Sequence, residues 1–141
     1  MYDRILVPVD GSENSNAALR EAIKLAKLTG GKITVMHVYL RWSTAFIDDS
    51  TQKGLHKEIK NAAKTVLDDA KKIAAMENFN VETLLAEGDA VHEIVKAADS
   101  GKFDLIVMGA RGVSKFIELV LGSVSRGVLE KATCPILITK P

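Results

Sequence analysis

Apolar and polar positions follow two patterns that alternate along the chain. Short unbroken apolar runs bounded by turn residues are typical of buried strands, whereas apolar residues three and four positions apart are typical of helices. The apolar runs predict strands at residues 4–9, 33–39, 81–86, 105–108 and 135–139. The helical spacing predicts helices at about residues 13–29, 50–77, 90–100 and 124–132.

Turn residues separate these predicted elements. Ser12 or Asn14 is expected to cap the first helix, and the glycine pair at 30–31 is expected to end it. Residues 41–50 have no hydrophobic period, so they are interpreted as a loop whose course the sequence leaves open.

Regular alternation of strands and helices predicts a single α/β domain over residues 1–141. Such a domain has an open, mostly parallel sheet with helices on both faces. The strand at 81–86 contains Glu82 and Thr83, so it suits an edge of the sheet. The pattern leaves the order of the strands open.

A glycine-rich stretch follows the apolar run 105–108. Gly109 and Gly112 can adopt left-handed backbone conformations and let a ligand approach the backbone closely. Residues 122–125 open the last helix, whose first amides and serine hydroxyls suit an anion of phosphate size. Positive charge nearby comes from Arg111, Lys115 and Arg126. The stretch indicates a phosphate site, although a lone Gly-x-x-Gly also suits a plain turn.

Spacing excludes two common phosphate-binding loops. A P-loop needs Gly-Lys followed by Ser or Thr, and the two Gly-Lys pairs, at 31–32 and 101–102, precede predicted strands instead. The dinucleotide fingerprint needs three glycines between the first strand and the first helix, whereas the Gly-x-x-Gly at 109–112 lies late in the chain.

Composition is that of an ordinary globular protein. Hydrophobic residues make up 47%, charged residues 26%, and the formal net charge is +1. This balance indicates no nucleic-acid partner, and no apolar run approaches the roughly 20 residues that span a bilayer. We therefore expect a cytoplasmic protein without a membrane partner. The single cysteine, Cys134, is expected to be a small buried thiol.

Individual polar residues have both a structural and a functional interpretation. Asp10 ends the first strand, where its carboxylate could bind a ribose, lie near a metal carried by a nucleotide, or cap the turn. His37 lies in an apolar strand and is expected to be packed and hydrogen-bonded. His56 and His92 lack the partners of a zinc site, so no metal ligand is identified.

Several motifs together carry a family resemblance. Gly109, two residues, Gly112, nine residues and then the Gly-Ser pair at 122–123 resemble the nucleotide-binding signature of the universal stress protein family, in its ATP-binding branch. Similar segments occur over essentially the whole chain: Ile5-Leu6-Val7-Pro8-Val9-Asp10-Gly11-Ser12, Val35-Met36-His37-Val38, Glu87-Gly88-Asp89 and Cys134-Pro135-Ile136-Leu137-Ile138.

The resemblance implies a fold, a ligand and a site. The fold would be Rossmann-like, of the adenine nucleotide alpha hydrolase-like type, with strand order 3-2-1-4-5. The ligand would be ATP with Mg²⁺, in a crevice at the carboxyl ends of the strands where the winding direction reverses. The binding residues would be Pro8, Val9, Asp10, Val38, Met108, Gly109, Arg111, Gly112, Gly122, Ser123, Val124 and Ser125.

The implied function is a nucleotide-dependent regulatory or stress-response module, and the alternative is a slow ATP hydrolase. The sequence reveals no residue that would position water for hydrolysis. In the implied order the strand at 135–139 is an apolar edge, which predicts a homodimer through that strand.

Two other classes fit less well. A phospho-receiver domain needs its phosphorylated aspartate after the third strand, where residues 84–89 offer no match. An adenylyl-transferring enzyme would need room for a second substrate domain, which a chain of 141 residues lacks.

Overall fold

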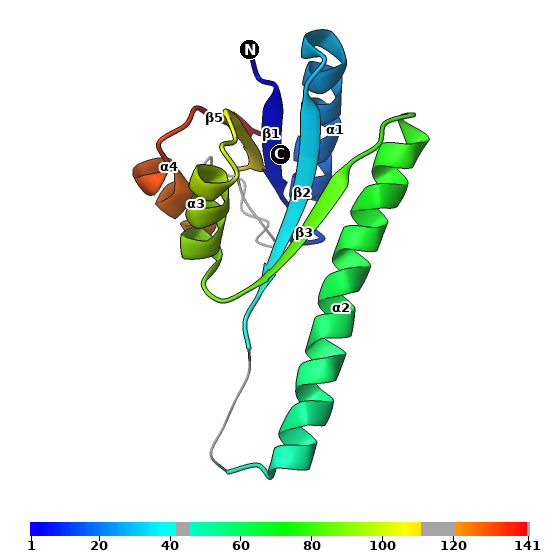
Figure 1. Ribbon diagram of the computed structural model, residues 1–141, viewed down its shortest axis with the longest axis vertical. Helices are drawn as coiled ribbons and strands as arrows, with labels where there is room; N and C mark the ends of the chain where they lie inside the picture. The colour runs from blue at the N-terminus through cyan, green and yellow to red at the C-terminus, as the bar shows by residue number, and fades with distance from the viewer. Residues whose placement is uncertain (42–45, 111–120, 141) are drawn as a thin grey trace.

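Five parallel strands form one sheet, and helices cover both of its faces (Figure 1). The computed structural model describes residues 1–41, 46–110 and 121–140. The strands are β1 (Arg4–Pro8), β2 (Lys32–Tyr39), β3 (Glu82–Glu87), β4 (Leu105–Gly109) and β5 (Ile136–Thr139). The helices are α1 (Glu13–Thr29), α2 (Asp49–Met76), α3 (Ala90–Ser100) and α4 (Ser123–Lys131).

The strand order is β3-β2-β1-β4-β5, and each neighbouring pair is parallel. The predicted fold and order are therefore confirmed, and the predicted edge strand at 81–86 is an edge. Winding reverses between β1 and β4, which are adjacent in the sheet although about 100 residues separate them in the chain. The carboxyl ends of these two strands define the crevice where open parallel sheets bind ligands.

The core lies in two layers, one on each face of the sheet. Alternate residues of a strand point to opposite faces, so Ile5 and Val7 pack with α1 and α2 while Leu6 packs with α3 and α4. All three side chains are fully buried. The unbroken apolar run of β1 is explained by this burial on both faces.

Helix caps agree with the turn residues of the sequence. Ser12 caps α1, because its hydroxyl accepts a hydrogen bond from the Ser15 amide, and Gly30 ends the helix with φ of 76°. The start of α2 differs slightly from the prediction. It begins at Asp49, because the Asp48 carboxylate accepts a hydrogen bond from the Thr51 amide at 2.8 Å.

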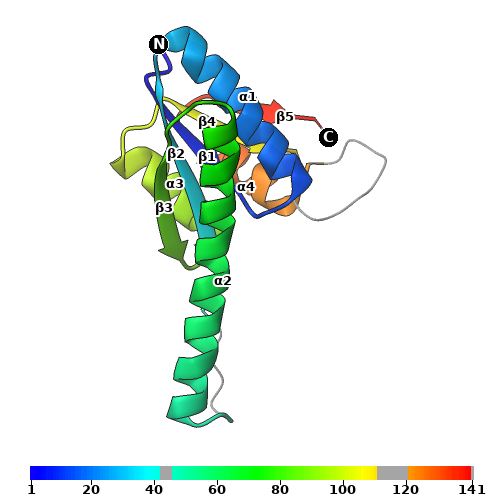
Figure 2. The same ribbon diagram turned by 90° about the vertical axis from the view of Figure 1, so that its right-hand side faces the viewer.

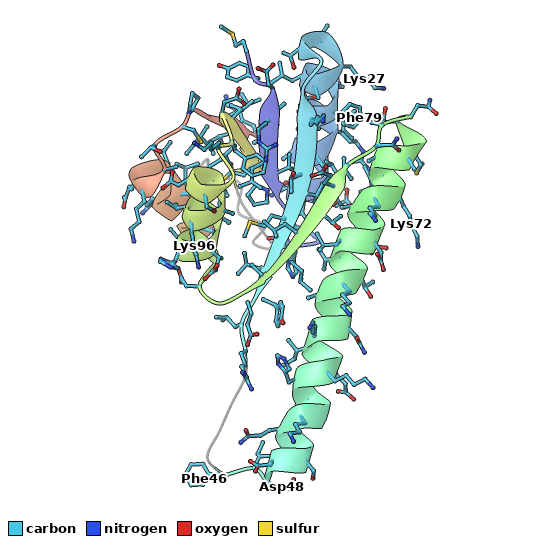
Figure 3. All side chains as sticks on the ribbon, viewed as in Figure 1. Lys27, Phe46, Asp48, Lys72, Phe79 and Lys96 are labelled. Atoms are coloured by element: carbon cyan, nitrogen blue, oxygen red, sulfur yellow. The ribbon has the colours of Figure 1, made fainter. Side chains whose placement is uncertain are left out.

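Helix α2 extends well beyond the sheet (Figure 2). Its buried residues, Ala63, Leu67, Ala70 and Ala74, all lie in its second half. The first half, residues 49–62, is called the α2 arm here, and Phe46 and Asp48 lie at its tip (Figure 3). Among the helices that the structure describes, none is long and apolar enough to cross a bilayer.

Candidate functional site

The carboxyl end of β4 lies directly beside the start of α4. The Ala110 carbonyl accepts a hydrogen bond from the Gly122 amide at 2.7 Å, and the Ala110 amide donates to the Thr139 carbonyl at 2.9 Å. The end of β4 and the start of α4 therefore lie at the same place. Arg111 and Gly112, both predicted site residues, lie outside the described residues.

The amino terminus of α4 has no side-chain cap among the described residues. Gly122 is the N-cap residue, with φ of −62° and ψ of 163°, and it has no side chain that could accept from the helix. The amides of Ser123, Val124 and Ser125 therefore keep the partial positive charge of a helix start. The partial charge at this end of α4 suits an anion.

Ser125 has a different role from its neighbour Ser123. Ser125 is only 3% exposed, and its hydroxyl lies 3.1 Å from the Gly109 carbonyl and 3.0 Å from the Ala110 carbonyl, to which it donates. This proton is used within the fold, so Ser125 fastens α4 to the end of β4. Ser123 is exposed at the start of α4.

Gly109 is required by packing rather than by a left-handed conformation. Its φ lies outside the left-handed region, unlike that of Gly11, which is 84°. A Cβ atom added at Gly109 would lie 2.9 Å from the Asn14 carbonyl oxygen and 3.2 Å from the Asn14 Cβ atom. The close approach is therefore made by the start of α1. The preceding residue, Met108, is buried in the α3–α4 layer.

Asp10 has the structural role that the sequence offered for it, in the turn before α1. Its Oδ1 atom accepts a hydrogen bond from the Ser12 amide at 2.9 Å, which forms the turn before α1. Its amide donates to the Ser15 hydroxyl at 3.3 Å. The residue is exposed, and no described residue occupies its Oδ2 atom, so this oxygen remains available to a ligand.

The strands β1 and β2 separate at the crevice. The last rung between them joins the Val9 amide to the Met36 carbonyl at 2.8 Å. The His37 ring nitrogen Nδ1 lies 2.7 Å from the Val9 carbonyl, so the prediction of a hydrogen-bonded His37 is confirmed. Val38 lies at this opening, while β2 stays paired with β3 as far as Tyr39 and Glu87.

Beyond Val38, polar side chains near the ends of β2 and β3 lie beside His56 of the α2 arm. The Tyr39 and His56 rings are 6.2 Å apart, and Arg41 Nε lies 3.8 Å from Glu87 Oε1. Burial raises the pKa of the Tyr39 hydroxyl, and the Glu87 carboxylate raises it further. Sequence periodicity did not reveal this group, because its members come from three separate elements.

Cys134, predicted to be a buried thiol, is only partly buried beside the α3–α4 layer. Burial raises the pKa of its thiol, and the carboxylates of Asp99 and Asp104 act in the same direction. A raised pKa keeps the sulfur in its unreactive protonated form, as expected for a structural thiol.

The sequence model of the universal stress protein family matches residues 1–140. The chain belongs to that family. Universal stress protein YxiE of Bacillus subtilis is 34% identical over 151 residues, an alignment that covers 99% of this chain and 100% of YxiE.

Solved structures of universal stress proteins have the same fold. The structure of MJ0577, a protein of Methanocaldococcus jannaschii, superimposes with a TM-score of 0.85 at 29% identity, covering 100% of this chain and 97% of that one. A universal stress protein in complex with cAMP has a TM-score of 0.74 at 26% identity, covering 98% and 97%. The Archaeoglobus fulgidus protein in complex with dAMP has a TM-score of 0.69 at 28% identity, covering 97% of each chain.

Proposed function

We propose that this universal stress protein binds ATP with Mg²⁺ and acts as a nucleotide-dependent regulatory module of the stress response. The observation that carries the proposal is the position of the uncapped α4 start at the carboxyl end of β4, the strand next to β1, at the same edge of the sheet as the opening between β1 and β2. One ligand could reach both from the crevice at the carboxyl ends of the strands. The cAMP and dAMP complexes of two relatives support an adenine nucleotide as that ligand.

Each part of the nucleotide has a candidate partner. The Oδ2 atom of Asp10 would accept from a ribose hydroxyl, and Val38 would contact the adenine at the opening of the ladder. The amides at the start of α4 and the Ser123 hydroxyl would bind phosphate oxygens. The walls would be Pro8, Val9 and Met108, with Arg111, Gly112 and Gly122 in the phosphate loop that the family resemblance implies.

Mg²⁺ would arrive with the phosphates. This ion keeps several of its waters and is usually bound through one or two carboxylates together with phosphate oxygens, so a dedicated protein cage is unnecessary. Among the described residues, no three His, Cys, Asp or Glu side chains gather into a metal site. Asp10, an exposed acidic residue at the end of β1, would supply such a carboxylate.

Thermal unfolding with and without saturating Mg-ATP tests the proposal. A ligand at 100 times its dissociation constant stabilises the folded state by about 2.7 kcal/mol, which would raise the midpoint measurably. Gly112→Val should abolish this shift by blocking the approach to the backbone. Gly54→Val is the matched control, because Gly54 lies in the α2 arm with open space around it. An unchanged midpoint together with no calorimetric heat of binding would refute ATP binding.

Turnover is expected to be slow or absent, because the groups described above would bind phosphate, and none of them is assigned to position a water for attack. Phosphate release at about 1 per second or faster, abolished by Gly112→Val, would instead establish the alternative function of an ATP hydrolase.

A further inference from the structure

The backbone hydrogen bonds between β1 and β2 end where a side chain, instead of a backbone amide, contacts the next carbonyl. In a parallel strand the N–H and C=O groups of one residue point to the same side. The Met36 carbonyl faces β1, where it accepts from the Val9 amide at 2.8 Å. Val38, two residues further on, must therefore present its amide to the same side. The next regular rung would join the Val38 amide to the Val9 carbonyl.

A contact from the His37 side chain replaces this backbone hydrogen bond. No bond joins the Val38 amide to the Val9 carbonyl in the described part of the chain, and the His37 Nδ1 atom lies 2.7 Å from that carbonyl. A carbonyl oxygen can only accept a hydrogen bond, so Nδ1 carries the proton. His37 therefore takes the place that the Val38 amide would occupy in a longer ladder.

The same bond orients the turn before α1. The Val9 carbonyl and the Asp10 amide belong to one planar peptide group, so fixing one direction fixes the other. With the carbonyl held by His37, the Asp10 amide points to the Ser15 hydroxyl, 3.3 Å away. Ser15 in turn donates to the Ser12 carbonyl at 3.0 Å. The hydrogen bond from His37 thus affects two places: the opening at Val38 and the backbone orientation at Asp10.

We propose that His37 is a positioning residue of the nucleotide site, which by holding the Val9 carbonyl leaves the Val38 amide free to donate to the adenine ring. This inference rests on the proposed ATP binding. His37 need not touch the nucleotide itself. Its effect should therefore fall on the adenosine part of the ligand and leave the phosphate part at the start of α4 unaffected.

Two variants of nearly equal shape separate the hydrogen bond from simple packing. His37→Asn keeps an N–H group at the δ position, whereas His37→Leu has a similar volume and no donor. Binding of ATP and of inorganic tripolyphosphate would be measured for both variants by competition against a fluorescent ATP analogue. Exchange of the Val38 amide with deuterated water would be measured by NMR without ligand.

We expect His37→Leu to bind ATP about tenfold more weakly, while tripolyphosphate binding stays within about twofold of the wild type. We expect His37→Asn to bind both ligands within about threefold of the wild type. Without the histidine donor, the Val38 amide should close onto the Val9 carbonyl and exchange at least about tenfold more slowly than in the wild type.

Unchanged ATP affinity in His37→Leu would overturn the inference, and so would a parallel loss for ATP and tripolyphosphate, which indicates general damage to the fold. Failure of the proposed function has a different signature. A wild-type protein that binds neither ligand refutes ATP binding, while the exchange of the Val38 amide still decides whether His37 holds the ladder open.

Discussion

Gly109 and Ser125 illustrate how single residues join β4 to the helices around it. The absence of a side chain at Gly109 lets the start of α1 approach, and the Ser125 hydroxyl fastens α4 to two backbone carbonyls. Both residues belong to the motif that suggested a phosphate site. In this structure the two residues hold the end of β4 against the start of α1 and the start of α4.

Gly109→Ala should destabilise the protein even without nucleotide. The added Cβ atom would lie 2.9 Å from the Asn14 carbonyl oxygen, and crowding of this kind costs about 1–3 kcal/mol in a packed site. Urea unfolding measures the change. Gly54→Ala is the control, because nothing lies within 4 Å of its added atom and alanine favours a helix by up to about 1 kcal/mol. Equal stability of Gly109→Ala and the wild type would contradict the packing role.

At the scale of elements, the α2 arm contains no buried residue, so local interactions carry much of its stability. Its residues precede the first buried residue of α2, Ala63. At its tip the Asp48 carboxylate accepts hydrogen bonds from the Ser50 hydroxyl and from the Thr51 amide and hydroxyl. These bonds, that from Ser50 foremost, lower the pKa of Asp48 from 3.8 to about 2. The cap is thus strongest when Asp48 is ionised.

The arm should therefore loosen at its start in acid. A carboxyl group with a lowered pKa stabilises the folded form above its ordinary pKa, and this contribution disappears as the pH falls from about 4 to about 2. The Thr51 amide shift, followed by NMR, should titrate with a midpoint near 2. Asp48→Asn, which caps without titrating, should show no such transition. A midpoint near 3.8 would mean that the cap is absent in solution.

The elements were predictable from the sequence because each carries a strong period and clear turn residues. All nine appear at nearly the expected bounds. The partners of individual side chains were less accessible, since they depend on residues distant in the chain. Asn14 beside Gly109, and the Val9 carbonyl beside His37, join separate strands and helices. The Ser125 hydroxyl was predicted as a ligand donor for the same reason: its two carbonyl acceptors lie outside α4.

At the scale of the whole molecule, β5 is an open edge of the sheet, as β3 is on the other side. The Pro135 carbonyl accepts a hydrogen bond from the Ile106 amide, and the Thr139 carbonyl accepts one from the Ala110 amide. The backbone groups of Pro135 and Thr139 therefore face β4. The amides of Ile136 and Ile138 must then point away from the sheet. A second copy of the chain could pair with them about a two-fold axis, which supports the proposed homodimer.

Ile138→Pro should weaken that dimer, because it removes an outward amide while leaving the bonds to β4 in place. Ile138→Ala is the control, since it loses a similar side-chain contact with the α3–α4 layer and keeps the amide. Light scattering should show a dimeric wild type, a dimeric alanine variant and a monomeric proline variant. A folded proline variant that stays dimeric, or a monomeric wild type, would exclude pairing through β5.

The long α2 helix determines how the molecule moves through a solvent. Its 28 residues span about 42 Å, and the α2 arm accounts for about 21 Å of that length, more than the radius of gyration of about 14 Å expected for a compact chain of this length. A particle with such a projection has more hydrodynamic drag than a sphere of 15.3 kDa. A single chain would therefore leave a gel-filtration column early, at a volume that calibration with spherical standards would assign to a heavier species. For this protein, mass and shape have to be measured separately.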